Sequence, residues 1–167
     1  DYLIPIVKAW CSDNGTVLAN LAMQVFGGAG YIEETGIAQL VRDVRITAIY
    51  EGTNGVQAAD LARKTVSDKG SLVRTLLVEA QQTANELAAI EPATAEPLQR
   101  ALELAERSTA LLVQQHETNP AATALNAAAY LEQTALTLGA AALAQNFLAA
   151  RNAEARFGST FCQAQQH

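Results

Sequence analysis

The chain has 167 residues, of which half are hydrophobic and 17% are charged, so it can bury one ordinary core or two small ones. Residues 1–69 carry six basic and eight acidic side chains, and residues 70–167 carry five and nine, for a formal net charge of −6. The hydrophobic half of the composition disfavours a disordered chain. Neither part has the basic excess that attracts phosphate backbones, which disfavours a nucleic-acid partner.

The first third of the chain has a helical pattern. Alanine is abundant, aromatics are few and β-branched residues are scattered, which favours closely packed helices and an all-α fold. Residues 1–10 are typical of a helix already under way, without an initiating Met or secretory leader, so we expect a piece of a longer protein. Capping residues at 12–14 predict a second helix over 15–26, with Val17, Leu18, Leu21 and Val25 on one face.

Glycines and caps divide the next stretch. Gly27 and Gly28 are expected to stop the second helix, and a third helix is predicted over 34–44. Residues 46–50 are apolar and β-branched enough to be extended. Thr53 or Asn54 can then cap a helix that reaches about Val66.

A polar break at 67–70 separates two predicted domains, 1–66 and 70–167, because composition changes there. Beyond it the spacing predicts three antiparallel helices. The first has Val73, Leu76, Leu77, Ala80, Ala84 and Leu87 in register. The second follows Pro92 and Pro97, with Leu98, Leu102, Ala105 and Leu112 in register, and the third runs from Asn119-Pro120 to about Ala150. The last helix is apolar on more than one face, as expected of a helix between neighbours. Its uncharged stretch 133–150 is too polar for a membrane span, and the tail from Arg151 is expected to fray.

The segment from Gln24 to Tyr31 contains three glycines. It follows a predicted helix, whereas a dinucleotide fingerprint follows a strand and opens a helix, so that fingerprint is excluded. Two interpretations stay open: a helix stop with a tight turn, or bare backbone that faces a phosphate.

Glu51 lies between Tyr50 and Gly52 at a predicted turn. A glutamate near a helix start is commonly a solvated surface residue. Bulky neighbours on one side and a glycine on the other favour a second interpretation, a partly desolvated carboxylate of increased basicity that abstracts a proton from carbon.

Other catalytic and metal-binding arrangements are not predicted. His116 and His167 have no partner at ligand spacing, no serine lies in a nucleophile elbow, and no metal site is expected. Cys11 and Cys162 are far apart, which favours free thiols and a cytoplasmic location. Arg42, Asp43 and Arg45 form a charge cluster expected to be a structural ion-pair arrangement.

Three segments in fixed order and spacing closely resemble the C-terminal helical domain of flavin-dependent acyl-CoA dehydrogenases. They are residues 24–36 (QVFGGAGYIEETG), 42–46 (RDVRI) and 49–57 (IYEGTNGVQ), and the resemblance holds over roughly residues 1–66. It is greatest to the bacterial branch with an additional C-terminal helical domain, which would account for residues 70–167.

The resemblance implies roles for particular residues. Glu51 would be the catalytic base that removes the α-proton of an acyl-CoA thioester while the β-hydrogen leaves as hydride to FAD, and its N–H would polarise the thioester carbonyl. Tyr50 and Gly52 would line the substrate site with it. Thr53 would contact the flavin of its own subunit. Gln24, Gly27 and Gly28 would contact the adenosine diphosphate part of a neighbour's flavin, so a homo-oligomer is expected.

The family's flavin cleft also needs an N-terminal helical domain and a middle β-domain. We therefore expect this chain alone neither to retain FAD nor to turn over substrate, and its parent to pass electrons to an electron-transfer flavoprotein. Many relatives have a glutamine where this chain has Gly55, so that flavin contact is not implied here. The alternatives are part of an acyl-CoA oxidase and a non-catalytic helical interaction module.

Overall fold

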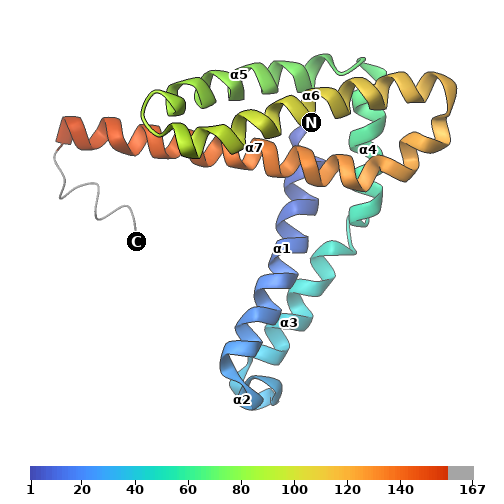
Figure 1. Cartoon of the computed structure of the whole chain (residues 1–167). Coiled ribbons are helices and arrows are strands. Elements are labelled where there is room, and N and C mark those ends of the chain that lie inside the picture. Colours follow the sequence, from blue (N-terminus) through green and yellow to red (C-terminus); the bar gives the residue numbers. More distant parts are fainter. Residues whose placement is uncertain (158–167) are drawn as a thin grey trace.

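The computed structural model describes residues 1–157, and every regular element within them is a helix (Figure 1), which confirms the all-α class. Two short 3₁₀ helices, Glu33–Thr35 and Ile46–Ala48, flank the third α-helix. The α-helices are α1 (Leu3–Phe26), α2 (Gly28–Tyr31), α3 (Ile37–Arg45), α4 (Asn54–Ser67), α5 (Ser71–Ala88), α6 (Pro92–Thr118) and α7 (Pro120–Phe157).

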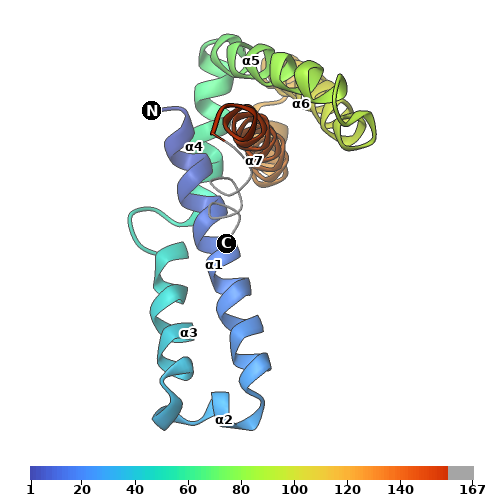
Figure 2. The ribbon, with the colours of Figure 1, turned by 90° about the vertical axis from the view of Figure 1, so that its left-hand side faces the viewer.

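The molecule has two visibly different parts. Helices α5, α6 and α7 lie side by side, and α1 leaves them to run outward with α3 returning beside it (Figures 1 and 2). We call residues 13–48 the arm, and residues 54–157 together with the first turns of α1 (3–12) the bundle. The turn that carries Glu51 joins the arm to the bundle.

Helix α1 is continuous, so the predicted interruption at 12–14 is wrong. The Ser12 hydroxyl donates to the Lys8 carbonyl at 2.7 Å, and the Asn14 amide donates to the Trp10 carbonyl at 2.8 Å. Side chains that cap helices can instead bond to a carbonyl one turn earlier inside a helix, and the sequence does not separate the two uses.

Glycine conformations determine where the arm turns. Gly27 ends α1 with φ 60° and donates its N–H to the Gln24 carbonyl at 3.1 Å, which confirms the predicted stop. Helix α3 begins at Ile37 and not near Glu34, because Gly36 before it is left-handed with φ 77°. Left-handed backbone is what glycine adopts without a steric penalty.

The prediction of an extended segment at 46–50 is wrong. Residues 46–48 form a 3₁₀ turn, and the Tyr50 N–H donates to the Ile46 carbonyl at 3.0 Å. Local β-branched content is overridden here by the short connection to α4. The predicted cap of α4 is confirmed, since Thr53 Oγ1 accepts from the Val56 N–H at 3.3 Å.

The predicted register of α6 is confirmed, and in α5 every predicted residue is buried except Leu76, which is half-buried. Leu98, Leu102, Ala105 and Leu112 of α6 are all buried. Helix α6 begins at Pro92, where a missing N–H costs nothing, and Pro97 lies inside its second turn.

Four hydroxyl groups meet inside the bundle core. Tyr2 contacts Thr65 at 2.9 Å, and Tyr130 contacts Thr109 at 3.1 Å. Both threonines donate to their own helices, to Leu61 and Ala105 carbonyls respectively, so the tyrosines are the donors to them. These contacts, which we call the hydroxyl cluster, connect the residue before α1 with α4, α6 and α7.

Two apolar faces remain uncovered. The α1 face with Val17, Leu18, Leu21 and Val25 is 56–85% exposed, because α3 approaches another side of α1, where Gly15 lies against Val44. Helix α7 is covered on one side only, which corrects the expectation of burial on several faces: Leu125, Leu136, Leu143 and Phe147 are exposed.

Among the described helices, none combines the length and apolar character needed to cross a membrane. Helix α7 extends past Ala150 to Phe157. The remaining tail, with Cys162, Gln163, Gln165, Gln166 and His167, lies outside the described residues.

Candidate functional site

The turn between the arm and α4 has a backbone conformation that few sequences accept. Glu51 has φ 54° and Gly52 has φ 83°. For a residue with a side chain, the left-handed region costs roughly 1–2 kcal/mol. Non-glycine residues in this region persist only where surrounding contacts hold them, and such positions cluster at functional sites.

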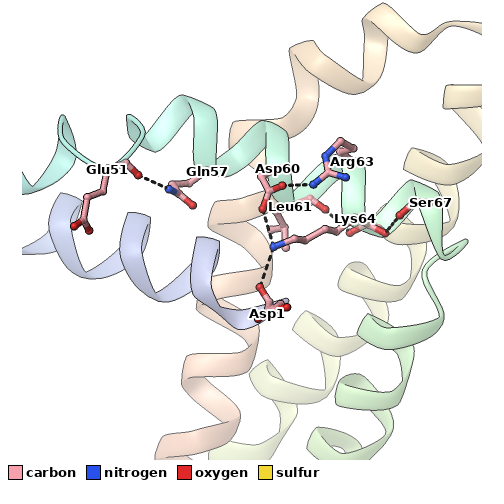
Figure 3. Close-up of polar contacts among 9 residues, drawn as sticks. Asp1, Glu51, Gln57, Asp60, Leu61, Arg63, Lys64 and Ser67 are labelled. Carbon is pink, nitrogen blue, oxygen red and sulfur yellow. Dashed lines mark hydrogen bonds and ion pairs between the residues drawn. The ribbon is translucent and has the colours of Figure 1, made fainter.

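Side chains from both flanking helices hold this turn. Lys8 of α1 donates to the Gly52 carbonyl at 2.8 Å and to Asn54 Oδ1 at 2.7 Å. The Gln57 amide of α4 donates to the Glu51 carbonyl at 3.0 Å, as drawn in Figure 3. Sequence reasoning missed the role of Lys8, because no local pattern connects it with a turn more than 40 residues away.

Asn54 links the start of α4 to α1. Its Nδ2 donates to Ser12 Oγ at 2.9 Å, to Asp13 Oδ1 at 2.6 Å and to the Ala9 carbonyl at 3.3 Å. The same side chain that sequence analysis considered as a helix cap therefore joins two helices, while Thr53 provides the cap.

The Glu51 side chain is exposed. The prediction of a partly desolvated carboxylate is therefore wrong for this chain by itself. Figure 3 shows the carboxylate pointing away from the Gln57 side chain that holds the Glu51 carbonyl. A groove of about 540 Å³ between α1, α4 and α7 is lined by Asn54 and Gly55 but not by Glu51. Tyr50, the residue before Glu51, is 50% exposed, so the predicted substrate-site residues form an open surface.

Hydrogen-bonding capacity at the turn is left unused. Among the described residues, no acceptor meets the N–H groups of Glu51 and Gly52. Thr53 Oγ1 accepts from Val56, and its own proton meets no acceptor in the described part of the chain. The turn thus offers two backbone donors and one hydroxyl donor beside a carboxylate, which suits a ligand with acceptor oxygens.

The second group of predicted site residues lies at the far end of the arm. Gln24, Gly27 and Gly28 are exposed, and a side chain placed on either glycine would meet no atom within 4 Å. This bare backbone fits close approach by another molecule. Twelve residues of straight helix separate Gln24 from Ser12, or about 18 Å at 1.5 Å per residue. The structure therefore brings Tyr50, Glu51, Gly52 and Thr53 together and keeps the glycine segment apart from them.

Ion pairs at the surface have structural roles. Arg42 donates to both Glu33 oxygens at 2.9 Å, and this guanidinium lowers the pKa of the Glu33 carboxyl. The Lys64 ammonium contacts the Asp60 carboxylate at 2.7 Å (Figure 3) and lowers the pKa of that carboxyl. The His116 Nδ1 forms a hydrogen bond with the Thr123 hydroxyl at 3.2 Å. Within the described part of the chain, no cluster of three possible metal ligands occurs.

Sequence comparison matches this site to a known domain. Residues 2–66 match the family model of the acyl-CoA dehydrogenase C-terminal domain. The matched range contains the turn, the arm and most of α4, and it ends before the three long bundle helices.

Three of the curated relatives that match are named as acyl-CoA dehydrogenases of different substrates. The chain is 44% identical over 88 residues to 3-methylmercaptopropionyl-CoA dehydrogenase of Ruegeria pomeroyi, covering 52% of this chain and 15% of that relative. It is 46% identical over 68 residues to butyryl-CoA dehydrogenase of Syntrophomonas wolfei, covering 40% and 11%. It is 38% identical over 71 residues to the broad-specificity linear acyl-CoA dehydrogenase FadE5 of Mycobacterium tuberculosis, covering 42% and 12%. The chain thus spans only 11–15% of the length of these relatives.

Proposed function

We propose that this chain is the part of a flavin-dependent acyl-CoA dehydrogenase that carries the catalytic base, Glu51. The observation that carries the proposal is the turn itself: a glutamate in left-handed backbone, whose N–H meets no acceptor among residues 1–157, within the matched acyl-CoA dehydrogenase segment. The three helices that follow, α5–α7, are the additional helical domain of the enzyme.

The carboxylate and the backbone donor act on adjacent atoms of the substrate. A Glu51 oxygen takes the α-proton, the electron pair left behind forms the Cα–Cβ double bond, and the β-hydrogen departs with its electrons. FAD, when bound, supplies the acceptor for that hydride. The Glu51 N–H donates to the thioester carbonyl oxygen, where negative charge develops as the α-proton leaves.

The exposed carboxylate requires a cover from the rest of the enzyme. A carboxylate in water is a weak base toward carbon, and removal of water raises its basicity. Tyr50 and Gly52 provide one wall of the substrate site, and other domains of the parent enzyme provide the remaining walls. This explains why the chain alone is proposed to be inactive.

The separation of the two groups of site residues supports a subunit-shared flavin. Thr53 would contact the flavin of its own subunit, while Gln24, Gly27 and Gly28 would contact the adenosine diphosphate part of a neighbour's flavin. The parent is a cytoplasmic homo-oligomer that acts on acyl-CoA and passes electrons to an electron-transfer flavoprotein.

The test uses the full-length parent enzyme with FAD and acyl-CoA under anaerobic conditions. Flavin bleaching on addition of substrate is expected, and Glu51→Gln should slow it about 10²–10⁴-fold, the range for loss of a general base. Glu34→Gln, an exposed arm glutamate, should leave the rate unchanged and serves as control. Unchanged bleaching in Glu51→Gln would refute the assignment, and rapid peroxide formation in air would make the parent an oxidase instead.

A further inference from the structure

Lys8 is distant in sequence from the turn yet bonds to it directly. It is half-buried in the first turns of α1, and its ammonium donates to the Gly52 carbonyl at 2.8 Å and to Asn54 Oδ1 at 2.7 Å. Both acceptors lie within three residues of Glu51. Hydrogen bonds from a charged donor are about twice as strong as neutral ones.

The Gly52 carbonyl lies in the peptide plane between Gly52 and Thr53, directly after the left-handed pair Glu51 and Gly52. On the other side, Gln57 holds the Glu51 carbonyl at 3.0 Å. The two carbonyls on either side of the Gly52 N–H are thus each held by a side-chain donor, one from α1 and one from α4. With both carbonyls engaged, the N–H groups of Glu51 and Gly52 have no acceptor among the described residues.

We propose that Lys8 is a positioning residue for Glu51: its ammonium fixes the Gly52 carbonyl, and so fixes the left-handed turn that aims the Glu51 N–H and carboxylate at the substrate. Lys8 acts through the backbone, since no ion pair joins it to the Glu51 carboxylate within the described contacts. This inference rests on the proposed function for its catalytic consequence, whereas its structural part can be tested on this chain alone.

The chain supplies a matched control. Lys64 is also half-buried, donates to a backbone carbonyl (Asp1, 3.0 Å) and contacts one side chain (Asp60, 2.7 Å), but it lies away from the turn (Figure 3). Replacing either lysine with methionine removes one charge and two contacts while keeping an apolar stem. A difference between the two variants therefore reports the position of the lysine and not the loss of charge.

The first readout is NMR of this chain. In Lys8→Met the amide signals of Glu51 and Gly52 should move, and exchange of the flanking Tyr50 and Gln57 N–H groups should rise about tenfold. Lys64→Met should leave all four unchanged, and Lys8→Arg, which keeps donors at this position, should restore them in part. If Lys8→Met unfolds the chain, Lys8→Gln takes its place. Unmoved Glu51 and Gly52 signals, or equal changes in both methionine variants, would overturn the proposal.

The second readout is the full-length enzyme. Lys8→Met should lower kcat about tenfold or more with KM and flavin content unchanged, because a misdirected base slows chemistry without weakening binding. Unchanged kcat alongside displaced turn signals would overturn the positioning role while leaving Glu51 as the base. Loss of the proposed function itself would appear separately, as full activity in Glu51→Gln.

Discussion

The arm and the bundle are built from the same kinds of residue but differ in how much of their surface they cover for themselves. Between Cys11 and Glu51 only Ser12, Gly30, Ala38 and Ala48 are buried. The bundle instead buries a continuous set of leucines and alanines from α4 to α7. The arm thus depends on other surfaces for its cover, whereas the bundle, which continues with α5–α7 beyond the matched residues 2–66, covers its own core.

The largest contrast should appear when a leucine is truncated in each part. Leu61 of α4 is 0% exposed, so Leu61→Ala should lower the free energy of unfolding by about 2–5 kcal/mol through lost burial and a cavity. Leu40→Ala in the arm, where the side chain is 59% exposed, should change it by less than about 0.5 kcal/mol. Urea denaturation of both variants measures this, and equal losses would mean that the arm has a core of its own.

Glycine replacement gives a smaller contrast, within the bundle. Gly70 has φ 75°, and a Cβ there would lie 2.7 Å from Thr109 Cγ2, so Gly70→Ala should cost about 1–3 kcal/mol. Gly139 in α7 has open space around it, and Gly139→Ala should stabilise the helix by about 0.5–1 kcal/mol. Thermal unfolding should therefore shift in opposite directions for the two variants. Shifts in the same direction would contradict the packing at the α4–α5 turn.

Alkaline pH should weaken the bundle through Tyr2. Burial raises the pKa of the Tyr2 hydroxyl, so its contribution is fully present below the unfolded pKa of about 10 and is lost as pH rises further. Between pH 10 and 11 the native chain should lose up to about 1 kcal/mol more stability than Tyr2→Phe does. Tyr31→Phe, at an exposed position in the arm, is the control and should follow the native chain. Parallel pH profiles for native and Tyr2→Phe would show that the hydroxyl cluster opens before Tyr2 ionises.

Local signals in the sequence predicted the features that local chemistry determines. The stop at Gly27, the Thr53 cap and the start at Pro120 depend on residues within one turn of the feature, and the structure has all three. The leucine spacing of α6 likewise predicted its buried face. The glutamate in its turn was also found from local context, although its role remains a proposal.

Features that depend on distant contacts were missed or misjudged. Ser12 suggested a helix start, but its hydroxyl bonds within a continuous helix and its partner Asn54 lies on another element. The Lys8 contact with Gly52 joins residues whose spacing has no helical or strand period. Exposure of Glu51 could not be inferred either, because it depends on which surfaces surround the turn.

The hydroxyl cluster joins residues on both sides of the break at 67–70. Tyr2 precedes that break in the sequence. Its hydroxyl forms a hydrogen bond with Thr65 and also contacts the Tyr130 hydroxyl, so Tyr2 lies in the same interior as α6 and α7. Replacing α5–α7 with the helices of a relative would leave the Tyr2 and Thr65 hydroxyls without their partners, unless all four residues of the cluster were exchanged together. A protease cut at Lys69 should accordingly yield two polypeptides that still migrate as one species.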